Sequence, residues 1–224
     1  MPQPVDELRS PQSLATALTV MLSLEAGLAL LSAGVGFYGR GLMQDLITDP
    51  GSVAEDSLDR VDNMQMMIAS GRNLLGLALL VVFLVWFHRV RSNGQVFRPD
   101  GFSQGAGWAI GAWFIPIVNF ALPYRVALET WEASTQNAPD GSFRRTSAAP
   151  LTVWWVVYAF SWVLRLYDRF QNPAETAEEF SGQFTLGAVA DLTTAVAAVL
   201  AVLFVRKLTA LQAVKAVQGP NAAV

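Results

Sequence analysis

Two acidic side chains lie inside long apolar stretches of this sequence, where a charge is costly. Glu25 interrupts the apolar block at residues 14–37, and Asp191 lies within a second block at residues 183–206. An ionisable group at membrane depth marks a proton donor, an ion site or a bond between helices. If burial keeps them protonated, Glu25 and Asp191 are candidate catalytic residues that act as general acids. The simpler alternative is a hydrogen bond to a neighbouring helix.

A set of aromatic and amide side chains forms a second candidate site, for ligand binding. Tryptophans often form belts at the two membrane interfaces, which explains Trp86 and Trp131 better than Trp113 and Trp162. We therefore predict an internal aromatic pocket, whose ring faces also stabilise cations. The amide of Asn119 either binds a ligand or satisfies backbone groups released by the nearby prolines. The predicted ligand-binding residues are Trp113, Phe114, Asn119, Phe120, Tyr124, Tyr158 and Trp162.

Two arginines lie near the ends of apolar blocks. Arg165 and Asp168 are three residues apart, so the two side chains can meet on one helix face. The simplest interpretation is an ion pair that reaches the membrane surface. Arg72 has the same interpretation, and an ion pair to an acid of the preceding loop is equally consistent with the sequence.

Several kinds of chemistry are excluded by residue type. The chain has no cysteine and one histidine, His88. Disulfides, thiol catalysis, HExxH zinc sites and bis-histidine haem sites are therefore excluded. We predict no metal site and no cofactor, so any chemistry at the carboxylates is metal-free.

The elements that must position these residues are membrane helices. The chain has 224 residues, of which 53% are hydrophobic and 15% charged, with a mean hydropathy of +0.37. Soluble domains carry about 25% charged residues. We predict an all-α polytopic membrane protein in one helical domain, residues 1–218, with a flexible tail at 219–224. The predicted transmembrane helices are at about 14–37, 69–90, 149–168 and 183–206.

A third apolar block, within residues 106–134, decides the topology. Pro116 and Pro123 interrupt it, and proline removes a backbone donor and breaks a helix. Broken backbone at membrane depth is tolerated only where protein or a water-filled cavity satisfies it. The charge pattern of residues 124–134 predicts an amphipathic helix that lies in the interface. We therefore predict a re-entrant or interfacial element here.

The distribution of basic residues favours the same topology. If four blocks cross, most of the 15 Lys and Arg residues share one side with both termini. If all five blocks cross, the basic segment 88–105 and the basic C-terminal tail lie on opposite sides. Because basic loops stay cytoplasmic, we predict a cell-membrane protein with four spans and both termini cytoplasmic. Five spans are the alternative.

Several short motifs resemble a known family. They are Trp86-Phe87-His88-Arg89, the run GWAIGAWFIPIVN at 107–119, Pro123-Tyr124, the run ETWEAS at 129–134, and Trp154-Trp155. Together they resemble a bacterial family, common in actinobacteria, that is catalogued only as a domain of unknown function. The resemblance runs from about Ala69 to Gln212. It implies a multi-pass membrane protein, and it implies no activity, substrate or cofactor.

Three classes of function fit these observations. The first is a protein that binds a hydrophobic small molecule or a membrane partner through the aromatic pocket. The second is a metal-free intramembrane enzyme, of the acid-initiated cyclase or isomerase type, that acts on a lipid or isoprenoid through Asp191 or Glu25. The third is an ion-conducting or transport subunit. The lipid bilayer is the expected surrounding, no nucleic-acid partner is predicted, and the sequence leaves the oligomeric state open.

Overall fold

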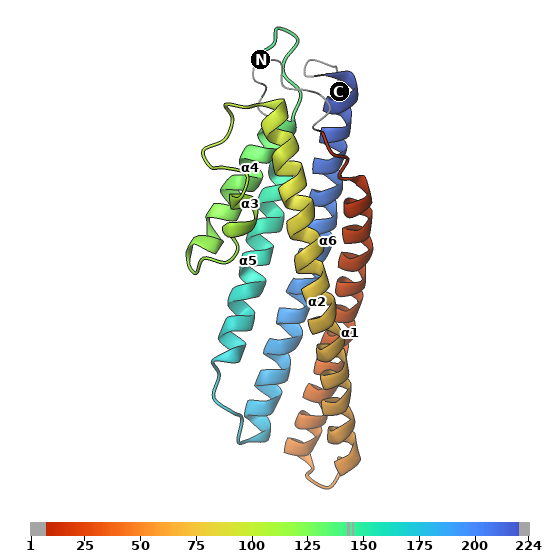
Figure 1. Cartoon of the computed structure of the whole chain (residues 1–224). Helices are drawn as coiled ribbons and strands as arrows, with labels where there is room; N and C mark the ends of the chain where they lie inside the picture. Colours follow the sequence, from red (N-terminus) through yellow and green to blue (C-terminus); the bar gives the residue numbers. More distant parts are fainter. Residues whose placement is uncertain (1–7, 143, 145, 220–224) are drawn as a thin grey trace. The chain divides into compact units, whose positions relative to one another are not determined.

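Helices are the regular secondary structure of the described part of the chain. The computed structural model describes residues 8–142, 144 and 146–219, and it contains no strand in these ranges. The elements are α1 (Gln12–Thr48), α2 (Glu55–Phe97), α3 (Trp108–Gly111), η2 (Val118–Phe120), α4 (Leu122–Ser134), α5 (Ala149–Arg169) and α6 (Ala177–Gln218) (Figure 1). The predicted tail at 219–224 lies outside the described residues, apart from Gly219.

Four of these helices are long and apolar enough to cross a membrane. They are α1, α2, α5 and α6, within the described residues. The prediction of an all-α protein with four candidate spans is therefore confirmed. At about 1.5 Å per residue, the 37 residues of α1 measure about 55 Å, whereas the hydrocarbon core of a bilayer is about 30 Å thick. The helix α1 is thus longer than the hydrocarbon core is thick, and α2 and α6, with 43 and 42 residues, are longer still.

The ends of the long helices follow local sequence signals. Before α6, the hydroxyl of Thr176 accepts a hydrogen bond from the backbone N–H of Glu179 (3.3 Å), whose carboxylate accepts one from the N–H of Thr176 (3.3 Å). This reciprocal arrangement is a capping box. At the other end of α6, Gly219 has a positive φ of 83°, which suits glycine after a helix C-terminus. These caps fix where α6 begins and ends.

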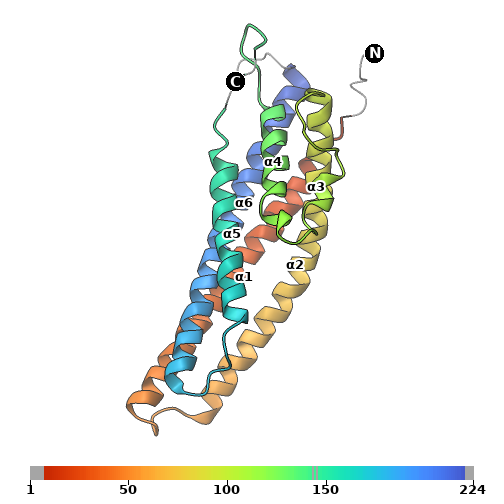
Figure 2. The same cartoon turned by 90° about the vertical axis from the view of Figure 1, so that its left-hand side faces the viewer.

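The third apolar block does not form a fifth long helix. It is divided into α3, η2 and α4, and Pro123 occupies the first turn of α4, where proline is tolerated. Between α3 and η2, Ile117 has a φ of 68°, which is rare for a β-branched residue. Figure 2 shows the chain leaving the end of α2, turning near η2 and returning along α4. The predicted broken third element is confirmed, and its depth in the membrane stays a prediction.

The chain divides into two compact units whose boundaries fall within the long helices. Unit 1 contains residues 1–21, 78–155 and 200–224, and unit 2 contains residues 22–77 and 156–199. All of α3, η2 and α4 belong to unit 1. Segments of all four long helices contribute to each unit.

Unit 2 is held together by small residues and a compact apolar core. Val35, Val61 and Ile68 are buried and pack with Leu42 and Phe184. Gly39 of α1 lies so close to α6 that a Cβ atom there would be 2.9 Å from the ring of Phe184. Small residues allow such close helix approach in membranes. The connections at 49–54 and 170–176 lie at the same end of this unit (Figure 1).

In unit 1, buried polar side chains of α6 form hydrogen bonds to neighbouring helices. The amide of Gln212 donates to the backbone oxygen of Val90 (2.8 Å) and to the hydroxyl of Ser134 (3.0 Å). The ammonium of Lys215 donates to the backbone oxygens of Ala133 (2.9 Å) and Thr135 (2.7 Å). Because the last carbonyls of a helix have no partner within the helix, Lys215 satisfies the C-terminus of α4 and ties it to α6.

Candidate functional site

A network of four charged side chains in unit 2 contains both predicted acids. Arg72 donates from Nε (3.0 Å) and Nη2 (2.8 Å) to Oε1 of Glu25, and from Nη1 to Oδ1 of Asp191 (2.6 Å). Arg165 donates from Nη2 to the same Oδ1 of Asp191 (2.9 Å). Glu25, Arg72, Arg165 and Asp191 come from α1, α2, α5 and α6, respectively. We call these four residues the charged network.

The charged network is largely shielded from solvent. The side chains of Glu25, Arg72 and Asp191 are 15%, 12% and 10% exposed, whereas that of Arg165 is 43% exposed. Oε2 of Glu25 is buried without a hydrogen-bond partner among the described residues. Since a buried charge is expensive unless it is paired, the balance of two carboxylates and two guanidinium groups lets these side chains share a membrane-spanning region.

The register between α1 and α2 explains the contact between Glu25 and Arg72. Ser32 lies seven residues after Glu25 on α1, and Gln65 lies seven residues before Arg72 on α2. Seven residues are close to two helical turns, so on antiparallel helices both pairs meet. Gln65 indeed bonds Ser32 through its Oε1 (2.9 Å) and its Nε2 (3.1 Å). One register therefore sets both the polar contact and the ion pair.

A polar cavity of about 430 Å³ leads to the charged network within unit 2. On α2 its lining residues follow the spacing of one helix face, from Asp62 through Gln65 and Ala69 to Arg72. On α6 the lining extends from Phe180 to Asp191. The lining residues are Ser32, Gly36, Asp62, Gln65, Ala69, Arg72, Arg165, Asp168, Phe180, Gln183, Phe184, Gly187, Ala188, Ala190 and Asp191. We call this space the polar cavity.

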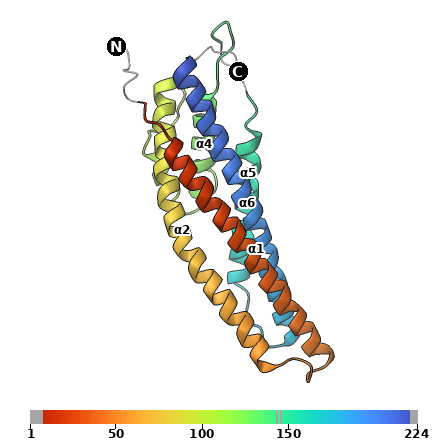
Figure 3. The same cartoon turned by 90° about the vertical axis from the view of Figure 1, so that its right-hand side faces the viewer.

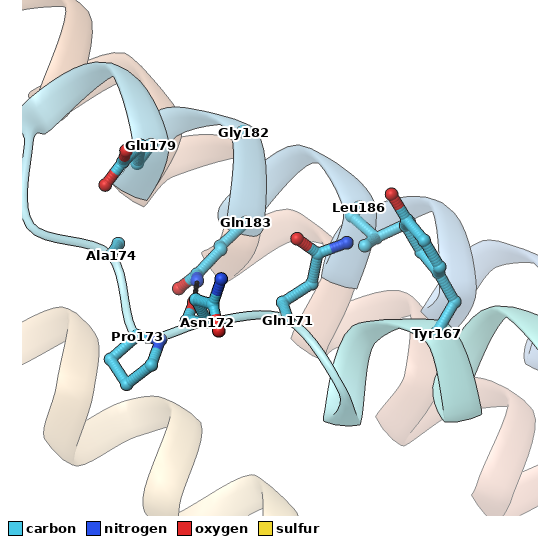
Figure 4. A pocket seen from close by; sticks show the side chains of 9 residues that line it. All are labelled: Tyr167, Gln171, Asn172, Pro173, Ala174, Glu179, Gly182, Gln183 and Leu186. Carbon is cyan, nitrogen blue, oxygen red and sulfur yellow. Dashed lines mark hydrogen bonds between the residues drawn. The ribbon is translucent and has the colours of Figure 1, made fainter.

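A second cavity of about 450 Å³ lies at the connection between α5 and α6. Figure 4 shows the side chains of Gln171, Asn172 and Gln183 gathered there, with Nε2 of Gln183 donating to the backbone oxygen of Asn172 (2.9 Å). Gln183 also lines the polar cavity. The two cavities are thus neighbours that share one amide side chain.

The aromatic residues predicted to bind a ligand are divided between the two units. Trp113 and Tyr124 belong to a cluster in unit 1, where each lies against Trp155, with ring centroids 5.8 and 6.0 Å apart. Tyr158 and Trp162 lie on α5 in unit 2. The aromatic cluster consists of Phe83, Trp86, Phe87, Trp113, Tyr124, Trp131, Trp154, Trp155 and Phe204.

The aromatic cluster is a packed core. Trp86, Phe87, Trp131 and Phe204 are fully buried, and Trp154 stacks on Phe204 at 4.9 Å. Nε1 of Trp86 donates to the hydroxyl of Thr209 (3.2 Å), so its polar atom is satisfied within the core. The rings of the aromatic cluster therefore pack against one another within unit 1.

The remaining predicted residues belong to the broken third element. Phe114 and Phe120 are 61% and 47% exposed, so their rings lie on the surface of unit 1. Oδ1 of Asn119 is buried without a partner among the described residues. Because proline removes a backbone donor, the groups that Pro116 and Pro123 release are carbonyl acceptors, which this oxygen cannot satisfy.

The partners of Glu25 and Asp191 differ from those that the sequence predicts. Arg72 pairs with Glu25 and Asp191, whereas the sequence favoured an interfacial role or a loop acid. Arg165 donates to Asp191 and to Thr194 (2.8 Å), whereas the sequence favoured Asp168. In the sequence, Arg72 and Arg165 each lie near one end of an apolar block. Pairing these two arginines with the two lone acids of the apolar blocks would have predicted the contacts with Glu25 and Asp191.

The described residues contain no group of three or more His, Cys, Asp or Glu side chains arranged to hold a metal ion.

Comparison with known proteins identifies a family. A family model described as "Domain of unknown function (DUF4328)" matches residues 49–210. This range covers more than half of the chain, and the chain therefore belongs to this family. No curated protein matches the chain. No solved structure matches it either.

Proposed function

We propose that this member of the DUF4328 family is a multi-pass membrane protein that binds a small, positively charged organic ligand in the polar cavity. The observation that carries the proposal is the imbalance of charge around the polar cavity. Both arginines of the lining are engaged with carboxylates, and two further aspartates line the same space.

Asp62 and Asp168 provide the excess negative charge. Within the described residues, neither carboxylate forms a salt bridge or a side-chain hydrogen bond with another residue. With Glu25, Arg72, Arg165 and Asp191 balanced among themselves, the two aspartates leave a formal charge of about −2 around the polar cavity at neutral pH. A cavity with excess negative charge and low-dielectric walls concentrates cations.

The other lining groups favour an organic cation. The rings of Phe180 and Phe184 line the cavity and offer faces that attract cations. The amides of Gln65 and Gln183 supply polar contacts that orient a ligand. The volume is about 430 Å³. Small-molecule sites typically have volumes of about 300–1000 Å³. An ammonium compound fits this chemistry and this size.

Thermal unfolding of the purified protein in detergent tests the proposal. Choline chloride is the probe, compared with sodium chloride at equal ionic strength. A ligand at 100 times its dissociation constant stabilises the folded state by about 2.7 kcal/mol, so choline is expected to raise the midpoint. Asp168→Asn is expected to weaken this effect. Asp59→Asn, which removes an exposed carboxylate outside the lining, is the matched control.

Two outcomes would overturn the proposal. The first is an equal midpoint in choline and sodium chloride at every concentration. The second is a choline effect that Asp168→Asn and Asp62→Asn leave unchanged, because the charge of the polar cavity would then have no part in it.

The alternative functions have less support. A hydrophobic ligand needs space among the aromatic rings, and these rings pack against one another in unit 1. An acid-initiated enzyme needs a carboxyl O–H aimed at its substrate, whereas Oε1 of Glu25 and Oδ1 of Asp191 accept hydrogen bonds from guanidinium groups. A transport subunit would use the polar cavity as part of its path, and a flux assay in liposomes tests this alternative.

We also propose that both termini are cytoplasmic, on the basis of the distribution of basic residues. The connections at 49–54 and 170–176 then face the opposite side of the membrane. In that orientation, the part of the polar cavity near Phe180 faces the extracytoplasmic end of unit 2.

A further inference from the structure

A cavity in unit 1, separate from the polar cavity, lies between the start of α1 and the end of α6. Figure 3 shows these two helical segments side by side. The cavity has a volume of about 580 Å³. Its lining residues are Gln12, Ala15, Thr16, Thr19, Arg206, Thr209, Ala210 and Ala213. We propose that this space, the α1–α6 cavity, binds the phosphate headgroup of an anionic phospholipid.

The charge of the α1–α6 cavity selects an anion. Arg206 is the only charged residue among the lining residues, and no carboxylate accompanies it. Its guanidinium forms no salt bridge or hydrogen bond with another described residue. A guanidinium has five donors in a planar fork that matches the oxygens of a phosphate group. Arg206 is thus a free cation at the edge of a cavity, available to an external anion.

Hydroxyl groups complete the polar lining. Thr16 donates to the backbone oxygen of Gln12 (3.1 Å), and Thr19 donates to that of Ala15 (2.8 Å). Such bonds to the helix backbone are weak and local, so the hydroxyl of Thr16 can turn to a phosphate oxygen. Thr209 is already held by Trp86. The first turn of α1, which begins at Gln12, also presents backbone N–H groups that favour an anion.

The position along each helix favours a lipid as the source of the phosphate. Arg206 directly follows the apolar run of α6, and Gln12 precedes that of α1, so both are at the boundary where headgroups lie. Within the apolar stretches, Leu203 on α6 and Val20 on α1 are each 55% exposed. These side chains provide a surface for the acyl chains of a lipid whose headgroup occupies the cavity.

Native mass spectrometry of the full-length protein in detergent tests the proposal. The probe is palmitoyl-oleoyl phosphatidylglycerol, compared with the corresponding phosphatidylcholine, whose added ammonium has no carboxylate partner in the cavity. Phosphatidylglycerol is expected to bind more tightly. Arg206→Gln is expected to weaken its binding about fivefold, the effect of one basic residue near a membrane surface, and Arg206→Lys is expected to retain most of it.

Lys207→Gln is the matched control, because it removes a neighbouring charge that does not line the cavity. Ala210→Phe fills the space without changing charge, and it is also expected to reduce binding. Size-exclusion profiles verify that each variant is folded. Equal losses in Arg206→Gln and Lys207→Gln would overturn the proposal, since they would indicate general surface charge. Displacement of the lipid by inorganic phosphate at the same concentration would overturn it too, since the site would then take a soluble anion.

Discussion

Removal of the Arg72 guanidinium is expected to destabilise the folded protein strongly. The change Arg72→Met keeps a long apolar stem and deletes three hydrogen bonds, two to Glu25 and one to Asp191. Asp191 keeps its bond to Arg165, so Glu25 is the carboxylate that loses its partner. Breaking a buried ion pair by deleting one member costs about 3–5 kcal/mol.

The expected change in melting temperature follows from the size of the chain. One kcal/mol shifts the midpoint by about 2–4 °C for 150–250 residues, so Arg72→Met is expected to lower it by roughly 6–20 °C. The measurement is thermal unfolding in detergent, followed by circular dichroism. Arg60→Met is the matched control. Arg60 forms an ion pair with Asp56, and the two side chains are 67% and 72% exposed, respectively. An exposed ion pair contributes about 0–1 kcal/mol to stability.

A double variant separates the charge effect from lost packing. In Arg72→Met with Glu25→Gln, the unpaired carboxylate becomes a neutral amide, so the double variant is expected to be more stable than Arg72→Met alone. Purely additive losses would refute the idea that the unpaired charge causes the damage. A midpoint for Arg72→Met within about 2 °C of that for Arg60→Met, the shift that 0.5–1 kcal/mol gives, would refute the whole argument.

Three further predictions concern packing, anchoring and orientation. Gly39→Leu is expected to lower the melting temperature, because even a Cβ would lie 2.9 Å from the ring of Phe184, whereas Gly41→Leu, with nothing within 4 Å, is the control. Lys215→Met is expected to speed amide hydrogen exchange at the end of α4, because two carbonyls there lose their donor; unchanged exchange would contradict the anchoring role. The chain has no cysteine, so a single Ala54→Cys is expected to react with an impermeant maleimide in intact cells, while Gly105→Cys is expected to stay protected. The reverse labelling would contradict cytoplasmic termini.

The sequence predicts the number and kind of helices well, and their extent less well. Apolar blocks reveal the part of each helix that suits a membrane, so residues 14–37 are evident. The extension of α1 to Thr48 and the start of α2 at Glu55 are not evident, because these turns are polar and hydropathy does not report helix propensity. Proline at 116 and 123 does predict the interruption of the third block, because its effect on the backbone is local.

The sequence predicts the two acids of the candidate site and does not predict the arginines that pair with them. Glu25 and Asp191 are conspicuous because each is a lone acid in an apolar block. Their common partner Arg72 is separated from Asp191 by 119 positions, and only the packing of the helices brings them together. The aromatic residues illustrate the same limit. Sequence spacing cannot separate a packed core from a lined pocket, because the space between rings is set by tertiary contacts.

The order of the four network residues along the chain bears on how the protein enters a membrane. Glu25 and Arg72 belong to the first helical hairpin, α1 and α2, and Arg165 and Asp191 belong to the second, α5 and α6. Each hairpin carries one acid and one base that bond each other directly. During synthesis, the first hairpin can therefore leave the translocon with its network acid and base paired, before the second hairpin exists. The bond between Arg72 and Asp191 requires both hairpins, so it joins two halves whose network charges can already be paired.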